Sequence, residues 1–286
     1  MAKNNNLGDF LKGIADKFRS KLGITGTINP QNFEDKIDAV YDAAAQKAYD
    51  DFWDTFQQNG ERTKYDYAFA SDGWTNEIFK PKYNIRVTYG NQGNIFSYSG
   101  ITGSLKQILN DLGITLSFYQ MEGRHSGATF VFVATKFTEL PVIDFSEAEG
   151  DIALHTAFSN NPLLETIEKV ILPVNCTAYG PNTFQADYAL KNIDFGGTIK
   201  YTLSFQWNPL TADSMKNIFD HLDTADSDSA RTVTVKTATK TAYDEKYGNW
   251  DAKAAEFAAH PGGGVSAQGE TLLGPIREYV DREEYA

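Results

Sequence analysis

Apolar residues in the first sixty positions recur at the three- and four-residue spacing of amphipathic helices. The first set covers residues 7–22 and ends before Gly23, a common helix stop. A second helix is predicted to begin at Asn29-Pro30, an N-cap residue followed by proline in the first turn, and to continue through Trp53 and Phe56 to an end at Asn59-Gly60. Two such helices bury little surface alone, so we expect them to pack on a partner copy, another subunit or the following domain. The residues expected to mediate this attachment or oligomerisation are Phe10, Leu11, Ile14, Phe18, Phe33 and Ile37.

The helical period is lost after Gly60, where aromatic residues alternate with Asp, Gly and Lys. Strands and turns are therefore predicted over residues 65–98. A short helix is predicted over residues 104–112, because its leucine and isoleucine residues share one face and Gly113 follows them.

A loose unit recurs from residue 132 onward, with a phenylalanine, then a leucine, then an isoleucine three residues later. The anchoring phenylalanines are spaced by 26, 26 and 21 residues. This period favours a β-solenoid of leucine-rich-like coils, each giving one short strand and one turn. The alternative is an irregular β domain in which these are ordinary core residues. The predicted repeat core is Phe132, Leu140, Ile143, Phe158, Leu164, Ile167, Phe184, Leu190 and Ile193, with a degenerate fourth copy at Phe205 and Leu210.

The C-terminal part predicts a cap on the repeats, followed by a tail. A helix is expected over residues 212–222 with Thr211 as its N-cap, a strand over 232–237, and a last helix over 241–259 that Gly248 interrupts. The glycine run of residues 261–264 predicts a flexible linker. The acidic segment of residues 272–286 is either a disordered tail or a docking segment that orders on a partner.

Together these patterns predict an α+β protein in four parts. Residues 1–60 form a helical attachment or oligomerisation segment, and residues 61–211 form a small β-solenoid or leucine-rich-like repeat body. Residues 212–260 form a helix–strand–helix cap, and residues 261–286 form the linker and docking tail.

The composition of the 286 residues excludes several classes of protein. The 38 acidic and 26 basic residues give a net charge of −12, which disfavours binding to nucleic acid or to anionic membranes. The one cysteine, Cys176, excludes an internal disulfide framework and a multi-cysteine metal site. No run approaches the roughly 18 apolar residues of a membrane helix, and residues 1–6 lack the apolar core of a signal peptide, so we expect neither membrane insertion nor Sec export.

The residues that usually carry catalysis do not form a recognisable constellation. The histidines at 125, 155, 221 and 260 lack metal-site spacing, and Cys176 has no neighbouring base. A cluster of His221 with Asp220 and Asp223 is disfavoured, because adjacent helix positions point apart. No phosphate-binding or dinucleotide-binding glycine motif is present. We therefore expect no enzyme, no cofactor and no metal.

Acidic and aromatic residues leave two weaker possibilities. Asp144 and Asp194 hold equivalent places one residue after a repeat isoleucine, near Asp151 and Asp187. Equivalence favours a turn role, because a catalytic pair needs two different environments. The acidic run of residues 223–228 lacks the glycine and the distal glutamate of a calcium loop. Aromatic residues amid polar neighbours would suit carbohydrate or protein recognition, although such residues are more often core; they are Trp53, Tyr65, Tyr67, Phe69, Trp74, Trp207 and Trp250.

The run of residues 49–70, followed by Gly73-Trp74 and residues 79–83, resembles proteins encoded by tailed phages and prophages of Gram-positive gut bacteria. Those proteins pair such a block with degenerate leucine-rich-like repeats, here matched by residues 140–144 and 164–169, and end with a segment similar to residues 208–222. Residues 10–33 are similar to a helical opening found on phage virion and tail proteins. The resemblance covers residues 10–222, with fewer, eroded repeats and a long glycine-linked tail as departures.

The resemblance implies a structural protein of the virion, made in the host cytoplasm and mounted as a tail fibre, baseplate protein, head fibre or head decoration. A homo-oligomer is expected, most often a trimer for fibres, in contact with other virion proteins and with a host-surface glycan or protein. One alternative is a bacterial surface adhesin with the same repeats, which the absence of a signal peptide and of a sorting tail disfavours. Another is a glycan-degrading virion enzyme, which an acid pair on one solenoid face would indicate.

Overall fold

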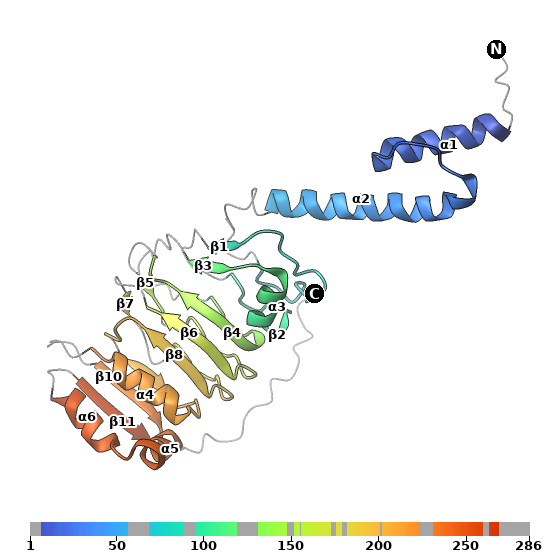
Figure 1. Ribbon diagram of the computed structural model, residues 1–286. Coiled ribbons are helices and arrows are strands. Elements are labelled where there is room, and N and C mark those ends of the chain that lie inside the picture. Colours follow the sequence, from blue (N-terminus) through green and yellow to red (C-terminus); the bar gives the residue numbers. More distant parts are fainter. Residues whose placement is uncertain are drawn as a thin grey trace, which may run out of the picture. The chain divides into compact units, whose positions relative to one another are not determined.

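The computed structural model describes residues 7–56, 69–87, 95–118, 131–147, 152–154, 156–172, 176–178, 182–200, 202–223, 231–259 and 263–268 (Figure 1). The chain divides into two compact units, Met1–Gly60 and Glu61–Ala286. The described residues combine helices with parallel sheets, and this mixed content is consistent with the predicted α+β class.

The first unit is a pair of helices that pack on each other. Helix α1 (Leu7–Leu22) is followed by a 3₁₀ turn, η1 (Pro30–Asn32), and by α2 (Phe33–Phe56). The predicted start of the second helix is confirmed, because the Asn29 side chain accepts a hydrogen bond from the Gln31 N–H at 3.0 Å. The helices share a small core of Ala15, Phe18, Ile28, Ile14, Ile24, Phe33 and Val40.

The second unit contains four sheets in which every described strand pairing is parallel. The largest sheet has the order β2-β4-β6-β8 and a three-stranded sheet has the order β11-β10-β9, while β1 pairs with β3 and β5 pairs with β7. The strands are β1 (Ile85–Val87), β2 (Thr102–Ser104), β3 (Leu116–Phe118), β4 (Lys136–Asp144), β5 (Ile152–Ala153), β6 (Thr166–Ile171), β7 (Cys176–Ala178), β8 (Asn192–Gly196), β9 (Leu203–Phe205), β10 (Arg231–Lys236) and β11 (Gly263–Gln268).

The register of the largest sheet aligns like residues from successive strands. Leu140 of β4 lies opposite Ile167 of β6, which lies opposite Ile193 of β8. All nine residues of the predicted repeat core are buried, each with at most 1% of its surface exposed. Repetition in the sequence therefore coincides with columns of apolar side chains that run across the strands.

A column of phenylalanine rings runs through the turns of this unit. Neighbouring rings stack with centroids 4.9–5.7 Å apart, and the column consists of Phe69, Phe96, Phe132, Phe158, Phe184 and Phe205. Main-chain hydrogen bonds join successive turns, as in the Phe132 N–H to Ala157 O bond at 2.8 Å and the Phe158 N–H to Thr183 O bond at 3.1 Å. We call this set the phenylalanine column.

Four short helices complete the described part of the unit, and the bounds of two of them lie within one residue of the prediction. Ser104 caps α3 (Leu105–Leu112), which ends at Gly113 in the left-handed conformation, and Thr211 caps α4 (Ala212–His221). Gly248, also left-handed, separates α5 (Thr237–Tyr247) from α6 (Trp250–Ala258). The predicted last helix thus begins four residues earlier than expected and is two helices.

Two sequence predictions need correction. The predicted flexible linker is wrong from Gly263 onward, because β11 pairs with β10 along six residues. Main-chain hydrogen bonds hold this strand, so Gly263 and Gly264 can belong to it without a side chain. In the region expected to contain strands and turns, the described residues before 95 include a single short strand, β1. The predicted tail of residues 272–286 lies outside the described part.

Candidate interaction surfaces

The helical unit leaves large apolar side chains in water. Leu7 and Phe10 lie one turn apart on α1 and are 71% and 64% exposed. Ile37 and Tyr41 lie one turn apart on α2 and are 59% and 75% exposed. We call these four residues the exposed helical set. Such side chains are worth about 1.5–3 kcal/mol each when fully buried, so a partner surface would gain from covering them.

The six residues predicted to mediate attachment are divided among three environments. Phe18 is buried, and its ring meets that of Phe33 at a centroid distance of 5.4 Å. Leu11, Ile14 and Phe33 are half-buried. Phe10 and Ile37 remain exposed. The three- and four-residue spacing alone could not separate the residues that join the two helices from those that face outward.

A lysine lies between two carboxylates on the four-stranded sheet. Lys106 Nζ of α3 is 3.3 Å from Glu139 Oε1 of β4 and 3.6 Å from Glu168 Oε2 of β6. Ser104 Oγ also donates to Glu139 Oε2 at 2.7 Å. The hydrogen bond to Glu139 and then the charge of Glu168 raise the pKa of Lys106. The two acids are therefore held by one cation, an arrangement that suits joining α3 to the sheet.

The three described aspartates among those considered from the sequence lie in different environments. Asp144 Oδ1 accepts from the Ser146 N–H at 2.8 Å, a turn role, while Asp194 is exposed on β8 and Asp187 is buried in a turn. Asp151 lies outside the described residues.

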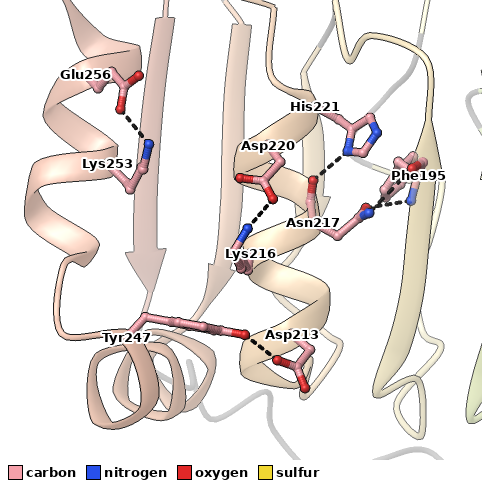
Figure 2. A network of polar contacts seen from close by, with 9 residues as sticks. All are labelled: Phe195, Asp213, Lys216, Asn217, Asp220, His221, Tyr247, Lys253 and Glu256. Atoms are coloured by element: carbon pink, nitrogen blue, oxygen red, sulfur yellow. Dashed lines mark hydrogen bonds and ion pairs between the residues drawn. The ribbon is translucent and has the colours of Figure 1, made fainter.

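Side chains close both edges of the four-stranded sheet. On β8, the Ile193 N–H donates to Ser214 Oγ at 2.9 Å. The Phe195 N–H donates to Asn217 Oδ1 at 2.6 Å (Figure 2), and both acceptors belong to α4. On β2, Asn76 both accepts from the Thr102 N–H at 2.8 Å and donates to the Thr102 carbonyl at 3.0 Å. Strand addition at these positions is thereby disfavoured.

His221 and Asp220, whose clustering with Asp223 was disfavoured from the sequence, both bond within α4. His221 Nδ1 lies 2.8 Å from the Asn217 carbonyl, and the Asp220 carboxylate bonds Lys216 (Figure 2). Within the described ranges, no group of three or more His, Cys, Asp and Glu residues is placed to hold a metal ion. The other three histidines, Asp226 and Asp228 lie outside those ranges.

The helices of the cap are joined by charged contacts at their surfaces. Lys246 Nζ of α5 lies 2.7 Å from Asp213 of α4, and Tyr247 bonds the same carboxylate (Figure 2). These two hydrogen bonds, first that of Lys246, lower the pKa of Asp213. Because the groups are exposed, these contacts orient the helices and add little stability.

Exposed aromatic side chains lie on the turns of the second unit. Tyr188 is 53% exposed and meets the half-buried Trp207 edge to face, with centroids 6.0 Å apart. Tyr98, which is 64% exposed, follows its column phenylalanine by two residues, as Trp207 does. Trp207 was a candidate for recognition from the sequence, whereas Tyr98 and Tyr188 were not. Of the other aromatic candidates, Trp53, Phe69 and Trp250 are buried, Trp74 is half-buried, and Tyr65 and Tyr67 lie outside the described residues.

No described helix is long and apolar enough to span a bilayer. The chain matches no protein-family model, no curated protein and no solved structure.

Proposed function

We propose that this chain is a structural protein of a phage virion, mounted as an appendage through its N-terminal helices and displaying its second unit. The observation that carries the proposal is the exposed helical set, which belongs to a compact unit of its own. Pairs of large apolar side chains that lie one turn apart and are left in water on a small helical unit favour an oligomer or attachment contact. The sequence resemblance to phage proteins supplies the context.

We also propose that the second unit is a short parallel solenoid of leucine-rich-like coils. Its supports are the 26-residue step from Ile167 to Ile193, the phenylalanine column and the main-chain bonds between successive turns. In a solenoid each coil contacts its two neighbours, and the end coils need a cap. Ser214 and Asn217 of α4 would supply that cap at β8.

A display and binding role fits the chemistry of this unit better than catalysis. The acid pair nearest to a catalytic arrangement, Glu139 and Glu168, is held by Lys106. The surface that would recognise a host glycan or protein is the turn side with Tyr188 and Trp207, because aromatic faces supply contact area at little entropic cost.

The test is the location of the protein during phage production. Particles from a culture that carries the gene would be purified on a density gradient and analysed by mass spectrometry, with immunogold labelling of the same particles. We expect the chain to co-purify with particles in a fixed ratio to the major capsid protein and to be labelled at one place. Absence from the particles, with labelling of intact cells, would overturn the proposal in favour of the adhesin.

A further inference from the structure

A buried polar column runs beside the phenylalanine column. The third residue after each stacked phenylalanine from Phe96 onward is polar and at most 3% exposed, and these residues are Ser99, Thr135, Asn161, Asp187 and Asn208. Asn161 shows how the column works. Its Oδ1 accepts from Thr135 N–H at 2.8 Å and from Thr135 Oγ1 at 2.7 Å, and its Nδ2 donates to the carbonyl of Phe158. One amide thus satisfies groups on two turns.

Asp187 occupies the place of this asparagine one turn further along. Its Oδ1 accepts from the Asn161 N–H at 2.7 Å, as Asn161 Oδ1 accepts from Thr135. Its second oxygen, Oδ2, takes the place of the Asn161 amide nitrogen, yet it is buried and has no hydrogen-bond partner among the described residues. A carboxylate oxygen, which only accepts, therefore occupies the position that the donor Nδ2 of Asn161 occupies one turn earlier.

Asn208, the next member of the polar column, also has an acceptor oxygen that lacks a donor among the described residues. Asn208 Nδ2 donates to the carbonyls of Phe184 at 3.2 Å and Asp187 at 2.9 Å, which fixes the orientation of its amide. Asn208 Oδ1 is then also buried without a donor in the described part of the chain. Acceptor oxygens of two neighbouring column residues thus lack a donor among the described residues, and a proton on Asp187 Oδ2 would turn one of these acceptors into a donor.

We propose that Asp187 is protonated in the folded protein and makes the second unit a pH-responsive fold, whose turns around residues 184–208 loosen when this proton is lost. The inference stands whether or not the chain belongs to a virion, because it rests on the turn geometry alone.

The surroundings of Asp187 favour the neutral acid. Burial raises the pKa of Asp187 well above its ordinary range, against the opposing effect of the two hydrogen bonds with Asn161. The groups that face it, Asn161 and Asn208, are uncharged amides. No charged side chain contributes to the raised pKa of Asp187. Of its titratable neighbours in the sequence, Tyr188 is exposed and Lys191 pairs with Glu165 at 3.7 Å.

The sign of the pH effect follows from the direction of this shift. An aspartate in the unfolded chain has a pKa of about 3.9, whereas the folded value is higher. The stabilisation from the proton is therefore complete below the unfolded pKa and is lost as pH rises through the folded pKa. Between the two values, the unfolding equilibrium constant rises about tenfold per pH unit because the native state binds one more proton.

The experiment compares the full chain with two variants by urea unfolding from pH 4 to pH 9. Asp187→Asn should follow the Asn161 pattern, with Oδ1 accepting from the Asn161 N–H and Nδ2 donating to Phe184. We expect it to remove the loss of stability between pH 4 and neutrality and to be at least tenfold less unfolded than wild type at pH 8. Asp194→Asn, the same change at an exposed site on β8, is the matched control and should keep the wild-type pH profile.

A second measurement does not depend on the variants folding. Carbon-13 NMR of the aspartate carboxyl groups in the wild-type chain, assigned through Asp187→Asn, should show one carboxyl that keeps its proton at pH values where ordinary aspartates have lost theirs. A signal for Asp187 that titrates near pH 4, or equal pH profiles for wild type and Asp187→Asn, would overturn the proposal.

Discussion

Single residues decide how one turn of the second unit connects to the next. The column positions of Phe132, Phe158 and Phe184 were visible in the sequence because their period is constant. Phe69 and Phe96 belong to the same column but were missed, because the step of 36 residues from Phe96 to Phe132 interrupts that period. The polar column was missed for another reason. Its members differ in type, and only their shared burial and bonding identify them.

Asn161 is the residue of this column with the most partners. We predict that Asn161→Ala destabilises the chain by about 2–4 kcal/mol, because it leaves two groups of Thr135 and the Phe158 carbonyl buried without partners. Urea unfolding monitored by circular dichroism measures this. Asn192→Ala, at an exposed position, should change stability by no more than about 0.5 kcal/mol. Equal effects of the two substitutions would show that the column does not carry the stability assigned to it.

A strained backbone position recurs two residues after four of the column phenylalanines. Tyr98, Ala134, Asn160 and Ala186 have φ between 53° and 63°, a region that costs residues other than glycine about 1–2 kcal/mol. We predict that Ala134→Gly stabilises the chain by up to about 1 kcal/mol, since relief of strain exceeds the entropy that glycine adds to the unfolded state. Ala255→Gly, inside α6, should have the opposite sign and cost about 1 kcal/mol. Thermal unfolding of the two variants measures these effects. A melting temperature below that of wild type for both variants would contradict the prediction.

At the scale of elements, local signals located the helices well and the strands less well. N-caps and glycine stops act within one turn of a helix, so Thr211 and Gly113 could be recognised from their neighbours, whereas Ser104 was placed inside the helix that it caps. Strand β11 could not, because its pairing partner β10 is about thirty residues away and its glycines suggested a linker. The closed edges of the sheet were likewise hidden, since they depend on Asn76 and Asn217 meeting strands far from them in the sequence.

Asn217 stands in for a missing strand beside β8. We predict that Asn217→Ala costs about 1–3 kcal/mol, because the Phe195 N–H loses its acceptor at a part-buried edge. Faster amide exchange at Phe195, measured by NMR or mass spectrometry, would locate the effect. Lys216→Ala, next to it on α4, removes an exposed ion pair with Asp220 and should leave exchange at β8 unchanged. A variant of Asn217 with wild-type exchange at Phe195 would show that α4 does not close this edge.

At the scale of the whole molecule, the chain combines a small helical unit with a larger unit of parallel strands. Helical periodicity predicted the first unit but not which apolar residues it leaves exposed, because two packed helices use residues from the same stripe for their own contact. Of the aromatic pair Tyr188 and Trp207, only Trp207 was recognised from the sequence, since the exposure of a side chain depends on the turn that carries it. The account of function therefore rests on the exposed helical set.

The most direct measurement is the mass of the full chain in solution by light scattering across a concentration series. The account predicts an oligomer for wild type and a folded monomer for the triple variant Phe10→Ser, Ile37→Ser and Tyr41→Ser, because these side chains would make the contact. A control with Ile78→Ser and Leu163→Ser, exposed apolar residues of the second unit, should keep the wild-type mass. A wild-type chain that stays monomeric at high concentration, or a triple variant with unchanged mass, would contradict the claim that the helices mediate assembly.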